Sequence, residues 1–421
     1  MLDLKFIRNN TDIVRTAVNN KGENANIDEI INLDENRRKL QFQFDEKKAE
    51  QNKKSKLIGK YKKEKKDTSK IIKDMKSLSA EIKDISQELN DVKNSLNLAL
   101  DSVPNIPSKD TPIGDSEKNN KFIREYGKKR KFDFVPKKHF EICNDLNLID
   151  MKRAAKVAGS GFALHFDKGA QLERALINFM IDFHTKKHGY LEMSPPLLVN
   201  RNTMRGTGQL PKLESDMYRV DEEDFFLIPT AEVPVTNYFS NEILPLEKLP
   251  AKFVSYTPCF RREAGSYGKD TKGLQRLHQF NKVEMVRIVK PQDSYQILEE
   301  MVEDAEDILK ALDLKYRVMQ LASGDLSFAS AKTYDLEVWA PASEKYLEVS
   351  SISNFEDFQA RRSSIKYRDE NGKAGFVHTL NGSGLATPRT MIAILEKYQR
   401  KDGHIDLPDA LKPYIGGKEN I

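Results

Sequence analysis

Two runs of alternating residues, Cys259-Phe-Arg-Arg-Glu263 and Phe280-Asn-Lys-Val-Glu-Met-Val286, enclose a loop rich in Gly and Lys at residues 265–273. Alternation on both sides of a glycine-containing loop predicts a β-hairpin in which every second side chain faces the same side. We expect four side chains to converge there: Arg261, Glu263, Phe280 and Glu284. This hairpin is therefore the first candidate for a functional site.

The residue types on the expected shared face suit a nucleotide and an amine. Arg261 can bind a phosphate through paired, charge-assisted hydrogen bonds, and Phe280 can cover a base. An inward carboxylate such as Glu284 needs a cationic or hydrogen-bonding partner, which a ligand amine supplies. The pattern by itself also fits a surface hairpin with salt bridges along its edges.

The composition indicates a globular protein with a large hydrated surface. The chain has 421 residues, of which 38% are hydrophobic and 32% charged, and its net charge is +5. A chain of this length is expected to hold two domains. No apolar run approaches the roughly 20 residues that span a membrane, and the charged N-terminus lacks the apolar core of a signal peptide. Two cysteines, Cys143 and Cys259, favour a reducing compartment, so we expect a cytoplasmic protein.

A heptad pattern predicts a long helix over residues 69–103. Apolar residues recur there at steps of four and three: Ile71, Met75, Leu78, Ile82, Ile85, Leu89, Val92, Leu96, Ala99 and Val103. Such a seam indicates a coiled coil. We expect its partner at residues 27–58, although Arg37, Lys47 and Lys54 interrupt the apolar stripe of that segment.

Eight lysines lie within residues 53–66, where we expect the chain to reverse between the two helices. Charge runs are usually solvated, but lysines along a protruding arm also suit contacts with nucleic-acid phosphates. The candidates for such contacts are Lys53, Lys54, Lys56, Lys60, Lys62 and Lys63.

Pro104 and Pro107 end the helical segment, and a polar connector follows to about Lys131. We therefore expect an N-terminal helical arm at residues 1–108 and a second domain at residues 109–421. In the second domain, residues 169–188 predict an amphipathic helix and residues 189–198 a strand that contains two prolines. Residues 335–339, 348–351 and 378–386 read as further strands, and residues 389–399 as a helix.

Three of these segments resemble the signature motifs of the class II aminoacyl-tRNA synthetases. Residues 260–285, FRREAGSYGKDTKGLQRLHQFNKVEM, resemble motif 2 of bacterial seryl-tRNA synthetases in particular. Residues 169–198 resemble motif 1, which builds a dimer interface, and residues 378–399 resemble motif 3. The resemblance covers essentially the whole chain. It implies an α+β fold with an antiparallel sheet flanked by helices, preceded by an N-terminal antiparallel two-helix coiled coil.

The resemblance also implies site residues at the matching positions. The positions that match catalytic residues of the family are Arg261, Arg389 and Glu348. Serine binding falls on Thr230, Ala231, Glu232, Glu284 and Ser383, and we expect Thr230 and Glu232 to flank an exposed strand end. ATP binding falls on Arg261, Arg262, Glu263, Arg276, Leu277, Phe280, Glu348, Val349, Ser350, Ser351 and Arg389. Glu348 and Ser351 match the ligands of Mg²⁺, a cation that prefers hard oxygen atoms.

The implied reaction is the ligation of L-serine to tRNA. Serine and ATP would give seryl-adenylate and pyrophosphate, and the 3′ end of tRNA(Ser) would then accept the seryl group. The helical arm would bind the tRNA, and the enzyme would be a homodimer. The resemblance leaves open whether tRNA(Sec) is also charged. Catalysis would rest on positioning and on neutralising charge at the α-phosphate.

Two positions depart from the bacterial pattern. Arg262 stands where relatives have a smaller polar residue, and alternation predicts that it points away from the face of Arg261. Pro388 stands directly before Arg389, and the first turn of a helix accepts proline because its N–H groups have no helical partner.

Two rival interpretations follow from the same residues. The first is a ligase of the same fold that loads amino acids onto carrier proteins or other acceptors, but such relatives lack the long basic arm. The second is an RNA-binding protein that has lost catalysis, which predicts the loss of Arg261, Glu348 or Arg389. All three are present.

Overall fold

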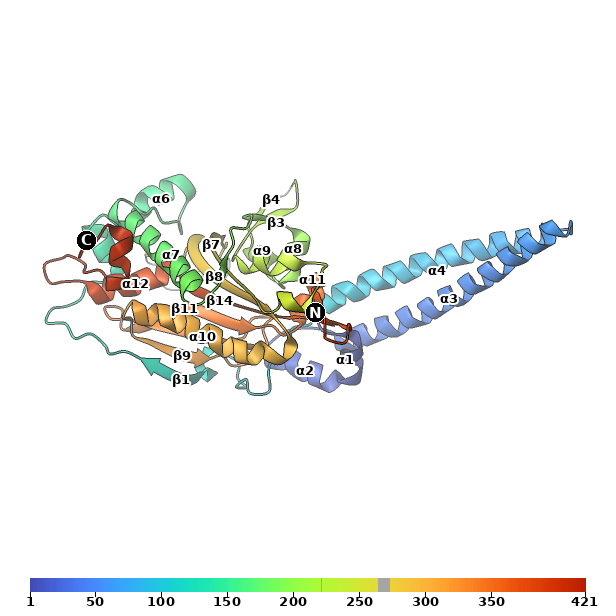
Figure 1. The fold of residues 1–421 in the computed structure, drawn as a ribbon, viewed down its shortest axis with the longest axis horizontal. Helices are drawn as coiled ribbons and strands as arrows, with labels where there is room; N and C mark the ends of the chain where they lie inside the picture. Colours follow the sequence, from blue (N-terminus) through green and yellow to red (C-terminus); the bar gives the residue numbers. More distant parts are fainter. Residues whose placement is uncertain (221, 264–272) are drawn as a thin grey trace. The chain divides into compact units, whose positions relative to one another are not determined.

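The computed structural model describes residues 1–220, 222–263 and 273–421. The chain divides into two compact units, Met1–Pro104 and Asn105–Ile421 (Figure 1). Most of the predicted loop at residues 265–273 lies outside the described residues. Across the described ranges, none of the helices combines the length and the hydropathy needed to cross a lipid bilayer.

The helices of the first unit are α1 (Leu4–Asn9), α2 (Thr11–Asn20), α3 (Ile27–Lys63) and α4 (Ser69–Asp101). Helices α3 and α4 form an antiparallel pair, because Gln41 contacts Lys93, Lys47 contacts Glu81 and Gln51 contacts Ser79. The predicted seam of α4 is buried at Leu78, Ile82, Leu89 and Leu96, with relative exposures of 2–6%. The prediction of a two-helix coiled coil is thus confirmed.

The chain reverses later than the sequence suggested. Helix α3 continues to Lys63, and the residues between it and α4 include Lys65 at φ 54°. Lysine is a good helix former and no proline interrupts the segment, so the cationic stretch extends the helix instead of forming a loop. Four exposed lysines, Lys53, Lys56, Lys60 and Lys63, follow at steps of three and four and therefore share one face of α3.

The polar residues predicted to weaken the seam of α3 are held by ion pairs. Arg37 pairs with the buried Asp34 at 2.7 Å, and Lys47 pairs with Glu81 of α4 at 2.6 Å. Arg8 of α1 also contacts Asp34 and so links the short helices to the long one. Lys54 pairs with Glu50 at 2.8 Å.

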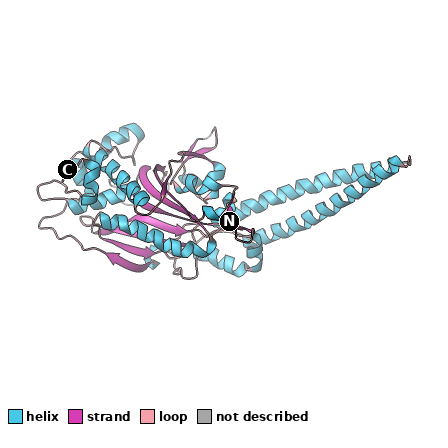
Figure 2. Ribbon diagram, viewed as in Figure 1, coloured by secondary structure: helices cyan, strands magenta, loops and turns pink. Residues whose placement is uncertain are grey.

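The second unit is built on an eight-stranded sheet in the order β1-β9-β10-β11-β14-β8-β7-β2. Figure 2 shows the strands of this unit in magenta with helices around them. All neighbours are antiparallel except β2 and β7. Its strands are β1 (Lys121–Tyr126), β2 (Leu191–Glu192), β7 (Ala251–Phe260), β8 (Gln279–Val289), β9 (Tyr316–Gln320), β10 (Lys332–Ala340), β11 (Lys345–Asn354) and β14 (His378–Ala386). The predicted fold class is confirmed.

Two three-stranded sheets, β13-β12-β6 and β3-β5-β4, complete the second unit. Their strands are β3 (Leu198–Asn200), β4 (Arg219–Val220), β5 (Phe225–Leu227), β6 (Ile243–Leu244), β12 (Lys366–Arg368) and β13 (Ala374–Phe376). The α-helices of the unit are α5 (His139–Asp145), α6 (Met151–Ala158), α7 (Lys168–Lys186), α8 (Arg201–Gly206), α9 (Glu232–Thr236), α10 (Ser294–Ala311), α11 (Phe358–Ser363) and α12 (Thr387–Tyr398). Short 3₁₀ helices lie at 117–119, 214–216, 237–239, 246–248, 291–293 and 409–415.

The prediction of a single strand at residues 189–198 is wrong. Leu191–Glu192 pairs with β7 at the edge of the large sheet, while Leu198–Asn200 joins β5 in a small one. Pro195 and Pro196 lie between the two strands, because proline has no N–H to donate to a ladder.

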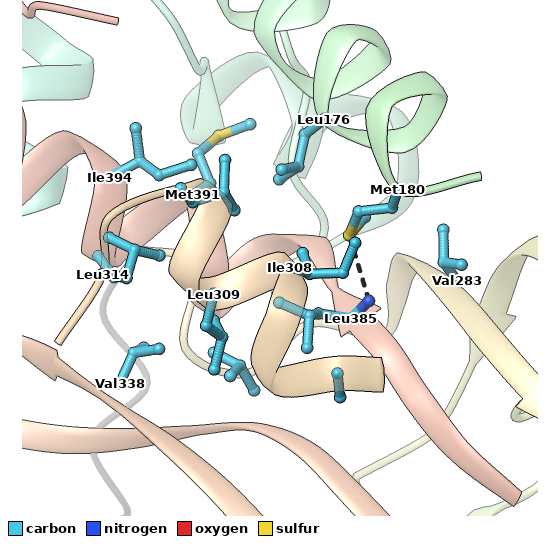
Figure 3. Packing of buried hydrophobic residues seen from close by; sticks show 14 of the residues in the cluster. Leu176, Met180, Val283, Ile308, Leu309, Leu314, Val338, Leu385, Met391 and Ile394 are labelled. Atoms are coloured by element: carbon cyan, nitrogen blue, oxygen red, sulfur yellow. Dashed lines mark hydrogen bonds between the residues drawn. The ribbon is translucent and has the colours of Figure 1, made fainter. Parts of the chain in front are cut away.

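The predicted hairpin is formed by β7 and β8, with Cys259 opposite Phe280. Val283 and Met285 of β8 belong to the main hydrophobic core, which helices α7, α10 and α12 build together with the sheet (Figure 3). The alternate residues Val286 and Ile288 pack in a different cluster. Glu284 alternates with the core residues and so lies on the other face of the sheet, where the cavity described next is found.

Candidate active site

A cavity of about 640 Å³ lies over the centre of the large sheet. Its walls come from β8, β11 and β14, from the start of α12 and from loops at residues 207–209 and 327–329. Its volume is in the range of small-molecule sites. Most site residues expected from the sequence line it: Thr230, Glu232, Arg261, Glu263, Arg276, Leu277, Phe280, Glu284, Glu348, Val349, Ser351, Ser383 and Arg389.

Of the residues expected to bind serine, ATP or Mg²⁺, three do not line the cavity. Ala231 is buried in a separate hydrophobic cluster. Arg262 is exposed, and its backbone N–H donates to the Asp216 carbonyl at 2.8 Å. The Ser350 hydroxyl is buried and donates to the Ser383 carbonyl at 2.5 Å, so Ser350 bonds the backbone behind the cavity.

One end of the cavity holds more carboxylates than ammonium groups. Glu232 and Glu284 are both buried, and Lys282 Nζ lies 2.6 Å from Glu284 Oε2. Burial and, after it, the nearby Glu284 carboxylate raise the pKa of Glu232 to about 7, against the hydrogen bond from Gln359. A bound cation at this end would relieve both penalties.

The surroundings of Thr230 and Glu232 differ from the exposed strand end that the sequence suggested. Both residues are buried, and Glu232 begins the short helix α9. The Thr230 hydroxyl accepts a hydrogen bond from the Glu232 backbone N–H at 3.2 Å, as a residue at a helix start often does. The sequence could not indicate this burial, because the cover comes from distant segments.

Gln359 orients Glu232 and was missed by the sequence reasoning. Its side-chain amide donates to Glu232 Oε1 at 2.7 Å and to the Thr207 carbonyl at 3.1 Å, while Thr379 donates to its oxygen at 2.7 Å. Nothing in the sequence near Gln359 indicates a site. The contact links α11, β14 and the loop at residue 207.

The other end of the cavity is rich in arginine. Arg276 Nη1 lies 3.0 Å from Glu263 Oε2, and Arg389 Nη1 lies 3.1 Å from Glu348 Oε2. Arg261 lies over the Phe280 ring, with 5.2 Å from its guanidinium carbon to the ring centre. Its Nε donates to the Pro229 carbonyl at 3.3 Å, and no carboxylate within the described ranges forms an ion pair with it. Arg261 can therefore offer its charge to an anion.

Pro388 is accommodated as expected. It lies in the first turn of α12, and Arg389 remains in the cavity lining.

The predicted Mg²⁺ ligands lie beside a buried carboxyl group that the sequence reasoning did not include. Asp335 pairs with Ser351 across β10 and β11, and burial followed by the nearby Glu348 carboxylate raises the pKa of Asp335 well above its usual range. Its Oδ1 atom is buried and finds no hydrogen-bond partner in the described part of the chain. Two carboxylates and a hydroxyl fit Mg²⁺, which keeps several waters and binds phosphates. No cluster of three His, Cys, Asp or Glu side chains is placed for a metal within residues 1–220, 222–263 and 273–421.

The two histidines inside the motifs have structural contacts. His278 Nδ1 lies 3.0 Å from the Arg261 carbonyl, which fixes the backbone at the end of β7. His378 Nδ1 lies 2.8 Å from the Ser294 hydroxyl, and burial lowers the pKa of His378 to about 4. Both contacts are structural, because each holds the imidazole ring in one orientation.

A hairpin and a strand–helix unit that bring arginines into one cavity on an antiparallel sheet define the class II aminoacyl-tRNA synthetases. The family described as "tRNA synthetase class II core domain (G, H, P, S and T)" matches residues 214–398, and the "Seryl-tRNA synthetase N-terminal domain" matches residues 1–107.

Full-length relatives narrow the class to one family. The chain is 56% identical to the serine--tRNA ligase of Caldicellulosiruptor saccharolyticus, with 99% of each chain covered, and 53% identical to that of Natranaerobius thermophilus, with 100% of each covered. The seryl-tRNA synthetase of Pyrococcus horikoshii, solved with ATP, superposes with a TM-score of 0.92 at 35% identity over 100% of this chain and 99% of that one. The chain belongs to the seryl-tRNA synthetase family. The family, fold class and enzyme class predicted from the sequence are thereby confirmed.

Proposed function

We propose that this chain activates L-serine with ATP to form seryl-adenylate and pyrophosphate, and then transfers the seryl group to the 3′ end of tRNA(Ser). The observation that supports this proposal is the distribution of charge in the cavity: one end has more buried carboxylates than ammonium groups, and the other end has three arginines. Carboxylates can bind the ammonium group of an amino acid, and arginines can bind the phosphates of a nucleoside triphosphate. With one substrate at each end of the cavity, their reacting groups are held next to each other.

The serine subsite is the carboxylate end. The ammonium group of serine would lie between Glu232 and Glu284, because two carboxylates and one lysine leave room for one more positive charge. The hydroxyls of Thr230 and Ser383 line the same cavity and can bond the substrate. A pocket that bonds the serine hydroxyl rejects alanine, whose methyl group would leave polar groups unpaired.

The ATP subsite is the arginine end. Arg261 would bridge the serine carboxylate and the α-phosphate, while Arg276 and Arg389 would hold the outer phosphates. Phe280 would stack on adenine and Glu263 would accept from its amine. Glu348 and Ser351, with Asp335 behind them, would hold Mg²⁺, which when bound neutralises phosphate charge. Arg276 and Arg389 lie in ion pairs with Glu263 and Glu348, and phosphate can take the place of each carboxylate while Mg²⁺ takes the place of Arg389 beside Glu348.

The tRNA partner would contact the helical arm of residues 1–108, and the catalytic domain would comprise residues 109–421. Lys53, Lys56, Lys60 and Lys63 form an exposed cationic face on α3, which suits a phosphate backbone without base readout. Lys54 and Lys62 complete the proposed contact set. Whether tRNA(Sec) is a second acceptor can be measured in the same charging assay.

We also propose a homodimer in the cytoplasm. Strand β2 is the last strand of the large sheet and Leu191 on it is 66% exposed, an apolar edge that a second copy can cover. Sedimentation equilibrium should give twice the chain mass of 48.2 kDa. Both cysteines are buried and free, as suits a reducing compartment.

Amino-acid-dependent ATP–pyrophosphate exchange across all twenty amino acids tests the proposed activity. Serine should support exchange, and alanine should be disfavoured by about 10⁴–10⁵ because it cannot satisfy the polar groups of the pocket. Exchange that depends on another amino acid, or charging of a carrier protein in place of tRNA, would contradict the proposal.

The pKa of Glu232 predicts how serine use depends on pH. Because this pKa is raised to about 7, the carboxylate is protonated below pH 7 and attracts the serine ammonium less strongly. We expect kcat/KM for serine to fall by about tenfold for each pH unit below 7. The KM for ATP should change little over that range, because Glu232 lies at the other end of the cavity. A Glu232→Gln protein should lose this pH dependence, and a profile that persists unchanged in Glu232→Gln would assign it to another group.

A further inference from the structure

Strand β14 carries a bulge directly after the substrate-pocket residue Ser383. Ser383 lies opposite Glu284 of β8, but the next paired residue is Ala386, so Gly384 and Leu385 fall outside the ladder. On the other side, pairing with β11 ends at Gly382. Gly384 and Leu385 therefore lack the sheet bonds that would normally fix them, and Ser383 pairs with β8 but not with β11. Buried backbone groups without such bonds need other partners.

Three side chains from other elements supply these partners. The Ser350 hydroxyl of β11 donates to the Ser383 carbonyl at 2.5 Å, and His184 Nε2 of α7 lies 2.9 Å from the Gly384 carbonyl. Met180 of α7 accepts from the Leu385 N–H, with 3.1 Å between sulfur and nitrogen (Figure 3). A β-carbon on Gly384 would lie 2.4 Å from His184 Nε2, so glycine allows this approach.

The protons on the histidines follow from these partners. A carbonyl only accepts, so His184 Nε2 carries the proton and His184 Nδ1 is an acceptor. His188 Nδ1 lies 3.0 Å from that atom and can donate to it, while His188 Nε2 lies 3.4 Å from Asp307 and 3.7 Å from Asp304. The chain of contacts thus fixes the ring of His184, which is fully buried.

We propose that His184 is a positioning residue for the amino-acid pocket: by holding the Gly384 carbonyl, together with Ser350 on the Ser383 carbonyl, it fixes the bulge that presents Ser383 beside Glu284. This inference rests on the proposed function, since the pocket is taken as the serine subsite. Burial, helped by the neighbouring His188, lowers the pKa of His184 to about 3, so the ring stays neutral and keeps this hydrogen bond through ordinary pH.

The effect should be confined to the amino acid. The start of α12, which carries Arg389, is anchored separately by the Thr387 hydroxyl, 2.5 Å from Glu173 Oε1 and 3.1 Å from the Asn281 carbonyl. A shift of residues 383–385 would therefore displace the serine end of the cavity and leave the ATP end in place.

A matched pair of variants tests this role in the full-length protein by serine-dependent ATP–pyrophosphate exchange. The amide nitrogen of glutamine can stand where Nε2 stands, whereas the shorter asparagine reaches only the Nδ1 position. We expect His184→Asn to raise the KM for serine about five- to tenfold, from the loss of one buried hydrogen bond, with the KM for ATP within twofold. His184→Gln should restore the KM for serine to within about twofold of the original protein.

If His184 has a purely structural role, the KM for serine and the KM for ATP should change together, or His184→Asn and His184→Gln should change the KM for serine equally. Either outcome overturns the proposal. Thermal unfolding of each variant identifies a folding defect. If both histidine variants fail to fold, the Ser350→Ala protein tests the proposal instead, because this change removes only one hydroxyl. A rise in the KM for serine alone supports the proposed fixing of the bulge, and unchanged kinetics refute it. Absence of serine-dependent exchange in the original protein would instead refute the proposed function.

Discussion

An Arg261→Ala protein is expected to lose serine-dependent ATP–pyrophosphate exchange by at least 100- to 1,000-fold while keeping its fold. Arg261 is the arginine of the cavity for which the described ranges provide no carboxylate partner, so its charge is available to the α-phosphate and the serine carboxylate. Removing a preorganised donor from a developing anion has a cost of this size. Exchange kinetics measure the loss, and circular dichroism and thermal unfolding check the fold.

Arg262→Ala provides the matched comparison. The two arginines are adjacent and have the same charge, but Arg262 is exposed and does not line the cavity. We expect its exchange activity to stay within about twofold of the original. Near-normal exchange in Arg261→Ala would overturn the role given to Arg261, and equal losses in both proteins would point to net charge instead of position.

Deleting residues 30–100 is expected to spare adenylate formation and to reduce tRNA charging to a small fraction of its original rate. All residues that line the cavity belong to Asn105–Ile421, so the chemistry of activation does not draw on the arm. Pyrophosphate exchange and aminoacylation, measured on the same preparation, separate the two steps. Equal loss of both would show that the arm supports the fold of the catalytic unit.

A more specific variant than this deletion keeps the arm and removes only the cationic face of α3. Replacing Lys53, Lys56, Lys60 and Lys63 by alanine should leave exchange unchanged, weaken tRNA binding by tenfold or more, and lower the slope of log K against log salt by about 3 to 4. The charge-matched control replaces four exposed lysines of the catalytic unit: Lys109, Lys118, Lys373 and Lys418. If the control weakens tRNA binding equally, total charge rather than the arm face is responsible.

The sequence alone predicted the elements whose patterns are local. The heptads of α4, the alternation of β7 and β8, and the proline at the start of α12 each follow from periods and propensities that a few neighbouring residues carry. The position of Arg261 on the face of Glu284 follows from the same period of two. Helix α3 ran past its expected end because lysines favour helix, and residues 189–198 broke into two strands because of their prolines.

Only the tertiary structure decided what surrounds the reacting groups. Gln359 reaches Glu232 across 127 positions of sequence, and His184 reaches Gly384 across 200. Contacts of this kind leave no local pattern, because the two partners belong to different elements that meet only when the sheet and its helices pack. The burial that raises the pKa of Glu232 and Asp335 likewise comes from distant segments. The sequence therefore shows where carboxyl groups stand in the chain, but it does not show whether they are ionised in the folded protein.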